Sequence, residues 1–190
     1  MGVLSLISGC GTDKPKPTKW SEVREVFHDF QESLNNHDGH SAFELIDSNS
    51  KKFYSHAMIH ALYSDSSEVS LLPLLDKLII IGTRVTFDAQ TLQTLSVKEF
   101  YSENVKNFQT NSPFYYCSIG KLKLYGDTLI KAQLFYRKQS TGHFFKFYKE
   151  GVNWKISMMP FFQFGFESYL TQKLVDNTSD SVIIKDYLSQ

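Results

Sequence analysis

The periodicity of apolar residues changes at Pro113, and this change constrains the fold more than any other feature of the chain. Before Pro113, apolar residues recur at three- and four-residue spacing, which predicts amphipathic helices. After it, aromatic and β-branched residues fill short segments separated by turn residues, which predicts antiparallel strands. Helices first and strands later indicate an α+β fold, in which N-terminal helices pack on one face of a curved antiparallel sheet.

The helical part divides into five expected segments. The first covers 21–36, and its apolar face consists of Val23, Phe27, Phe30 and Leu34. The others are expected over 41–47, 50–63, 71–87 and 88–107, with a loop at 65–67. Pro73 stands near the start of the fourth segment, where a helix tolerates proline. Residues 78–81, taken alone, would also fit a buried strand.

The strand part predicts a meander. Strands are expected within 114–125 and over 129–137, 143–149 and 154–159, with turns at 126–127, 139–142 and 150–153. One face of the second strand is apolar and consists of Ile130, Ala132, Leu134 and Tyr136. We expect one domain over 20–172, a leader and tether over 1–19, and a polar tail over 173–190.

The leader carries Ile7-Ser8-Gly9-Cys10, which resembles a bacterial lipobox. The resemblance implies lipid attachment at Cys10 and a location in the bacterial cell envelope. Residues 11–19 hold two prolines and three lysines, which is typical of an extended tether. Only nine residues precede Cys10 and none is basic, whereas a signal has a basic region and about 7–15 apolar residues. Either the signal begins upstream, or the match is accidental and the protein is cytoplasmic.

The charge balance argues against nucleic-acid binding. The chain has 20 basic and 20 acidic side chains and no basic stripe, whereas phosphate neutralisation supplies most nucleic-acid affinity. No apolar run reaches the roughly 18 residues that span a bilayer, so a lipid at Cys10 is the only membrane attachment expected. Besides Cys10 there is only Cys117, which reads as a small buried apolar residue.

The strand segments carry a family resemblance. Residues 144–156 read Phe-Phe-Lys-Phe-Tyr-Lys-Glu-Gly-Val-Asn-Trp-Lys-Ile, and 124–129 place Gly-Asp at a hairpin turn. This is similar to the nuclear-transport-factor-2-like superfamily, whose members commonly close with a strand, a Gly- or Asn-containing turn and Trp-Lys-Ile. The resemblance covers about residues 20–160. It implies a cone-shaped shell that serves enzymes, binding proteins and scaffolds alike, and that often dimerises through its sheet.

The catalytic residues of the isomerase branch are not matched. That branch implies a carboxylate base with an oxyanion hole made by a tyrosine and a protonated acid. Phe27 or Phe30 stands at the tyrosine position, and 114–125 contains no acid. Asp38 lies near the position of the base, but within a His-Asp-Gly turn. The sequence therefore predicts no catalytic residue, cofactor or metal.

Two further sets of polar residues are candidates for a site. Arg84 lies in a very apolar stretch, where a cation needs a partner, and Asp76 or Asp88 could supply it. His56 and His60 are four residues apart and share a helix face, but no third metal ligand is identifiable nearby.

The functional expectation depends on the aromatic residues of the strand segments. The candidate ligand-binding residues are Tyr115, Tyr116, Tyr136, Phe145, Phe147 and Arg84. If the cone is open, these aromatic residues suit a small apolar ligand; if it is filled, they are core. The expectation is a non-enzymatic, lipid-anchored protein that binds a small apolar ligand or a protein partner. The alternatives are a small-molecule isomerase or dehydratase, and an immunity or assembly factor that acts through the sheet face, with or without a homodimer.

Overall fold

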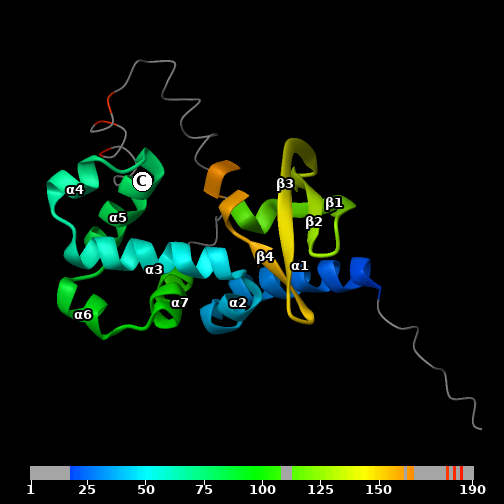
Figure 1. Cartoon of the computed structure of the whole chain (residues 1–190), viewed down its shortest axis with the longest axis horizontal. Helices are drawn as coiled ribbons and strands as arrows, with labels where there is room; N and C mark the ends of the chain where they lie inside the picture. Colours follow the sequence, from blue (N-terminus) through cyan, green and yellow to red (C-terminus); the bar gives the residue numbers. More distant parts are fainter. Residues whose placement is uncertain are drawn as a thin grey trace, which may run out of the picture.

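The N-terminal half of the chain is helical, and a four-stranded antiparallel sheet follows it (Figure 1). The computed structural model describes residues 18–107, 113–160 and 162–164, together with Ser179, Val182 and Lys185. The helices are α1 (Lys19–Asn35), α2 (Gly39–Leu45), α3 (Ser48–Tyr63), α4 (Ser66–Ser70), α5 (Leu74–Thr86), α6 (Ala89–Thr94), α7 (Val97–Asn107) and the short 3-10 helix η1 (Pro113–Tyr116). The α+β class predicted from the sequence is therefore confirmed.

Side-chain caps set where most of these helices begin. The N-cap side chains accept a hydrogen bond from a backbone N–H of the first turn, and they belong to Thr18, Asp38, Asp47, Asp65 and Asp88. Each cap satisfies a donor that the helix itself leaves without a partner. The caps therefore give first-turn backbone amides a partner where the chain turns from one short helix into the next.

The sheet is a simple meander. Its strands are β1 (Cys117–Tyr125), β2 (Leu129–Tyr136), β3 (Gln139–Glu150) and β4 (Asn153–Ser157), paired in that order. The turn between β2 and β3 consists of Arg137 and Lys138, whose φ angles are +48° and +66°. Positive φ at both positions matches the right-handed twist of the two strands that the turn joins.

The main core lies between α1 and the sheet. The apolar stripe predicted on α1 is buried, and it covers the inner face of the sheet. Phe27 lies 5.4 Å from Phe145 and 5.9 Å from Phe114 between ring centroids. The edge of β1 is bound by α1 side chains, since Gln31 donates to the carbonyl of Cys117 at 2.8 Å. This contact satisfies a carbonyl group that an open sheet edge would expose.

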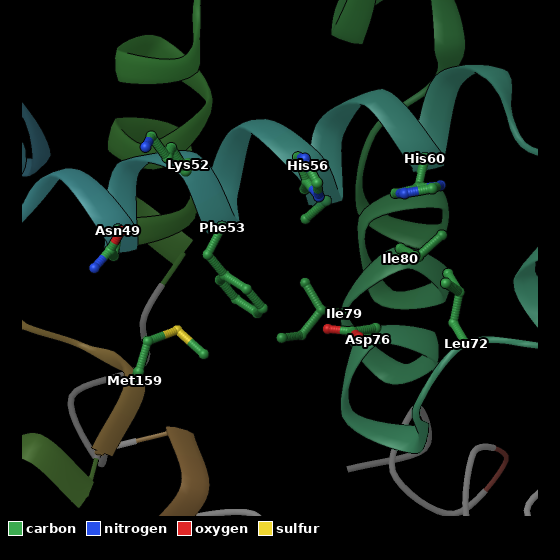
Figure 2. A pocket seen from close by; sticks show the side chains of 11 residues that line it. Asn49, Lys52, Phe53, His56, His60, Leu72, Asp76, Ile79, Ile80 and Met159 are labelled. Atoms are coloured by element: carbon green, nitrogen blue, oxygen red, sulfur yellow. The ribbon is translucent and has the colours of Figure 1, made fainter.

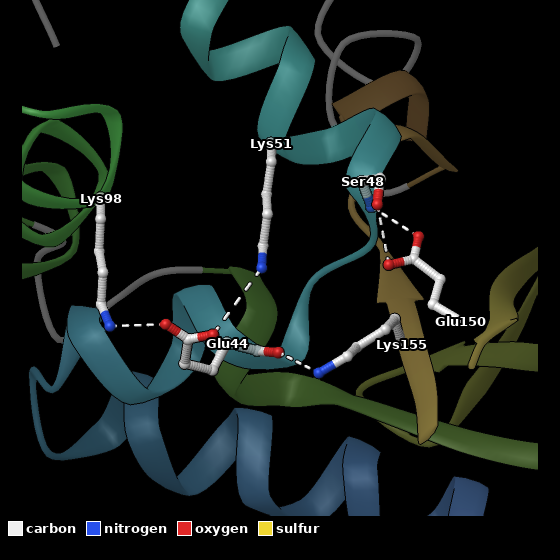
Figure 3. A network of polar contacts seen from close by, with 6 residues as sticks. All are labelled: Glu44, Ser48, Lys51, Lys98, Glu150 and Lys155. Carbon is white, nitrogen blue, oxygen red and sulfur yellow. Dashed lines mark hydrogen bonds and ion pairs between the residues drawn. The ribbon is translucent and has the colours of Figure 1, made fainter. Parts of the chain in front are cut away.

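The helices α3 to α7 extend away from the sheet, and α3 runs through them (Figure 1). At the junction, Glu44 of α2 binds Lys98 of α7 at 2.6 Å and Lys51 of α3 at 3.9 Å (Figure 3). Lys155 of β4 donates to the Glu44 carbonyl oxygen at 2.5 Å. The hydrogen bond from Lys98 is the main reason why the pKa of the Glu44 carboxyl lies below its ordinary value. Because these groups are largely exposed, the network orients the elements more than it stabilises them.

Several element boundaries differ from the sequence prediction. Residues 65–67, expected as a loop, form the cap and first residues of α4, because Asp65 caps that helix. The single helix expected over 88–107 is two, since Ser96 and Glu99 exchange backbone–side-chain bonds that begin α7. The turn expected at 139–142 is part of β3. Its glycine, Gly142, has a φ of +78° where the β2–β3 register shifts.

Candidate functional site

A groove of about 430 Å³ lies between α3 and α5, in the helical part of the molecule (Figure 2). Its apolar lining consists of Phe53, Ala57, Leu72, Ile79, Ile80 and Met159. Its polar lining consists of Asn49, Lys52, His56, His60 and Asp76. A largely apolar concave surface with a few polar groups has the composition of a small-molecule site.

The groove follows from the residue spacing on α3. Its α3 residues lie at 49, 52, 53, 56, 57 and 60, which is one continuous stripe of a helix. The opposite wall comes from one face of α5, and Met159 closes one end directly after β4. Phe53 also contacts Phe162, with ring centroids 5.4 Å apart. The walls are therefore held by regular helices and by the chain that follows the sheet.

The two histidines predicted to share a face do so, and both line the groove. The rings of His56 and His60 are 5.9 Å apart in an edge-on arrangement, and Nδ1 of His60 lies 2.8 Å from Oγ of Ser64. Asp76 reaches the groove from α5, across from the histidines (Figure 2). Within the described ranges, no group of three or more His, Cys, Asp or Glu side chains is arranged to hold a metal ion. The polar side chains of the lining can donate and accept hydrogen bonds.

Arg84 of α5 binds the C-terminal end of α3. Its guanidinium donates to the carbonyl oxygens of His60 at 2.8 Å and of Ala61 at 2.9 Å, and it also contacts that of Ser64. The His60 and Ala61 carbonyls belong to the last turn of α3, and Ser64 is its C-cap. Carbonyls at the C-terminal end of a helix have few partners within the helix. The sequence predicts a carboxylate partner for Arg84, whereas Asp88 accepts hydrogen bonds from Thr91 as the cap of α6. Arg84 thus fixes α3 relative to α5, beside the groove.

The aromatic residues proposed as ligand contacts belong to η1 and the strands, whereas Arg84 belongs to α5, which lies away from the sheet (Figure 1). Phe145 and Phe147 are fully buried in the core beneath α1. Tyr116 and Tyr136 lie at one end of the sheet, where the Arg137 guanidinium stands 4.9 Å and 5.4 Å from their ring centroids. The six predicted residues therefore do not converge on one cavity.

Tyr115 and Cys117 bound the same end of the core. The Tyr115 hydroxyl donates to the Leu34 carbonyl of α1 at 3.4 Å. Cys117 is buried, as its apolar surroundings in the sequence predict, and this burial raises the pKa of its thiol to about 12. A thiol with so high a pKa stays protonated at neutral pH and is a poor nucleophile.

One carboxyl group among the described residues is almost wholly buried, and it caps the N-terminus of α3. Asp47 is 1% exposed, and its Oδ1 accepts a hydrogen bond from the Ser50 amide at 2.9 Å. The Ser50 hydroxyl accepts from the Met158 amide at 2.9 Å, and Ser48 donates twice to Glu150 of β3 (Figure 3). These contacts fasten the start of α3 to the sheet. Asp47 is not part of the groove lining.

The lipobox-like segment, including Cys10, lies outside the described residues, as does most of the predicted tail. Along the part of the chain that is described, no helix combines the length and apolar character that crossing a membrane requires.

The chain has no match that identifies a family. No protein-family model matches it, and no curated protein or solved structure is similar to it at a significant level.

Proposed function

We propose that this protein is a non-enzymatic binding protein of the bacterial cell envelope, lipid-anchored at Cys10, that holds a mostly apolar small molecule between α3 and α5. The groove carries the proposal. Its volume of about 430 Å³ falls within the roughly 300–1,000 Å³ typical of small-molecule sites, and most of its lining is aliphatic or aromatic.

The polar lining suggests how the ligand is oriented. Lys52, His56 and His60 offer donors along α3, and Asp76 offers an acceptor on α5. A ligand with an apolar body and one polar end would place the body against Phe53 and its polar end along this rim. The proposal moves the expected ligand from the cone to the helical part of the molecule, because Phe145 and other aromatic side chains fill the inner face of the sheet.

Binding is favoured over catalysis by the use of the buried acid. An isomerase of the ketosteroid kind needs a carboxyl group in an apolar, ligand-accessible place. Asp47 caps α3 and is absent from the groove lining, where the acid present is the half-buried Asp76. Among the described residues, the fully buried acid therefore serves a helix cap and not the groove, which favours binding over the enzyme alternative.

Ligand binding is tested with 8-anilinonaphthalene-1-sulfonate, whose rings and sulfonate mimic an apolar body with a polar end. Ile79→Trp fills the groove and should abolish most of the fluorescence gain. Val85→Trp is the matched control, because Val85 lies on the same helix, is 68% exposed and is absent from the groove lining. Equal binding by both variants would mean that the ligand binds outside the groove.

A second measurement is mass spectrometry of an organic extract of the purified protein. The extract of the unaltered protein should contain a compound that the extract of Ile79→Trp lacks.

Anchoring is tested separately. The chain is expressed behind a complete lipoprotein signal, with and without Cys10→Ala. The unaltered chain should fractionate with membranes and the variant should not. If both forms fractionate alike, the lipobox interpretation is wrong, while the groove proposal stands on its own measurement.

A further inference from the structure

The outer face of the sheet, opposite α1, carries a row of lysines that no sequence motif reveals. Lys131 of β2 lies directly opposite Lys123 of β1 and Lys146 of β3. Phe145 and Phe147, which flank Lys146, are fully buried on the inner face. Side chains alternate between the faces of a strand, so the three lysines share the outer face, on strands about 4.8 Å apart. We call these residues the lysine row.

No acid faces the lysine row from the positions next to it. One step along the strands lie Tyr125, Leu129 and Tyr148, and Gln133 and Phe144 lie on the other side. The recorded ion pairs of the described residues involve Glu44 and Glu103, both on helices. Like charges directly opposite each other destabilise a strand pair, so this arrangement opposes folding. Departures from the rules of folding are expected at functional sites, so this arrangement favours a function for the face.

Exposed aromatic rings flank the lysine row. Tyr125 is 41% exposed and Phe144 is 46% exposed, and each lies two residues from a lysine of the row, on the same face. The ammonium groups of Lys123 and Lys131 lie 5.2 Å and 4.6 Å from the Tyr125 ring centroid. Among the described residues, the face therefore combines exposed aromatic rings with positive charges that form no ion pair.

We propose that this lysine–aromatic face docks on the surface of an anionic phospholipid bilayer. Clusters of lysine are attracted to anionic headgroups, and aromatic rings settle at the headgroup level. The chain as a whole is neutral, so the charge of this face reflects its arrangement rather than an overall excess. The proposal requires neither a ligand in the groove nor a lipid at Cys10.

Other occupants fit the face less well. A second copy that docks through the same patch would bring two lysine rows together, because a two-fold interface pairs a surface with itself. Single-stranded nucleic acid binds such faces by stacking bases on open rings, whereas the Tyr125 ring is already in contact with two ammonium groups. The charge complementarity of the face, together with its exposed rings, favours a membrane.

The test is flotation of the full chain carrying Cys10→Ala with vesicles of phosphatidylglycerol and phosphatidylcholine, and with vesicles of phosphatidylcholine alone. Lys123→Glu/Lys146→Glu creates a favourable alternation of charges across the strands and reverses the net charge of the row. Lys19→Glu/Lys106→Glu changes the net charge equally on exposed helical positions. The first variant should lower the partition coefficient on anionic vesicles at least about tenfold, and the second should leave it near the unaltered value.

Three outcomes would overturn the proposal. Equal binding to neutral vesicles would assign binding to apolar segments, and equal loss in both double variants would assign it to net charge. A single-stranded oligonucleotide could also displace the protein from the vesicles at a phosphate concentration below that of the anionic lipid. This result would assign the face to nucleic acid. Circular dichroism verifies that the variants fold.

Phe144→Ser tests the aromatic part of the face, because it leaves every charge in place. This variant should also weaken binding to anionic vesicles, and unchanged binding would exclude contact of the Phe144 ring with the membrane.

Discussion

The guanidinium of Arg84 donates a 2.8 Å hydrogen bond to the carbonyl oxygen of His60, which joins α5 to the last turn of α3. The same side chain also serves Ala61 and Ser64. A cation at this end of α3 is favourable because the carbonyl groups there carry the negative end of the helix dipole. The contact also holds together the two helices that form the groove.

Replacing Arg84 with methionine is expected to cost about 1.5–3 kcal/mol of unfolding free energy. Hydrogen bonds to charged groups contribute about that much, and the carbonyl oxygens would lose their planar fork of donors. Lysine should recover only part of the loss, because one ammonium cannot reproduce that fork. Urea unfolding measures both variants. Lys121→Met, at an exposed position of β1, should change stability by no more than about 0.5 kcal/mol, and an equally mild Arg84→Met would contradict the capping role.

Gly39 is expected to resist even the smallest substitution. A Cβ at this position would lie 2.4 Å from the Cα of Ser102, where α2 meets α7. Alanine favours a helix over glycine by about 1 kcal/mol, but overpacking costs about 1–3 kcal/mol and involves backbone that cannot move aside. Gly39→Ala should therefore lower the urea midpoint.

Gly126→Ala serves as the comparison for Gly39. Its surroundings are open, and its cost of about 1–2 kcal/mol arises from a φ of +61° alone. If Ser102→Gly, which removes the Cβ and Oγ but leaves the Cα, restored Gly39→Ala completely, the backbone approach would not be the cause.

The fold was largely predictable because strong periodic patterns coincide with its core. The stripe that begins at Val23 is buried as expected, and so are alternate residues of β2. The missed boundaries share one cause, which is that Asp and Ser serve helix caps as well as loops. Ser96 and Glu99 have the spacing of a capping box, and Asp65 and Glu68 repeat it, so this signal could have separated α6 from α7 and identified α4.

The candidate site was less predictable, because it depends on which segments lie side by side. The pairing of His56 with His60 follows from helix geometry, but their position opposite Asp76 depends on how α5 packs against α3. The lysine row likewise depends on the register of three strands. A shift of one residue would turn a lysine of the row to the other face of the sheet.

Acid is expected to weaken aspartate helix caps, among them those of α4 and α6. The hydrogen bond from the Ser67 side chain lowers the pKa of Asp65 below its ordinary value of 3.8, and the bond from Thr91 does the same for Asp88. When the pKa of a carboxyl group is lower in the folded state than in the unfolded state, the stability that the group contributes is fully present at pH values above its unfolded-state pKa. This stability is lost as the pH falls through the folded-state pKa. The thermal midpoint should therefore fall as the pH drops below 3.8.

Asp65→Asn/Asp88→Asn should reduce this acid dependence while keeping the caps. Asparagine retains a side-chain oxygen that accepts from the helix backbone, but it does not titrate. Calorimetry across the acid range compares the slopes. Asp29→Asn, an exposed position within α1, measures the general effect of removing negative charge. A slope for the double variant as steep as that of the unaltered chain would assign the acid sensitivity to other groups.

Lys131→Glu is expected to stabilise the protein while it weakens binding to anionic vesicles. The glutamate would stand between Lys123 and Lys146, so two repulsive cross-strand pairs become attractive, each worth about 0.2–1 kcal/mol. Against this gain stands the lost contact of the Lys131 ammonium with the Tyr125 ring, worth about 0.5–1 kcal/mol at an exposed site. At mid-range values the two pairs outweigh the ring contact, and a small net gain of roughly 0.5 kcal/mol follows.

Lys131→Gln separates the two contributions, because it removes the repulsion without adding attraction. Unfolding free energies at low salt should rank glutamate above glutamine and glutamine above lysine, and the spread should narrow as salt screens the exposed charges. A ranking with lysine highest would mean that the ammonium groups diverge enough not to repel each other. The row would then oppose folding too little to indicate a selected surface. Stability that rises while vesicle binding falls would instead tie both effects to the same three side chains.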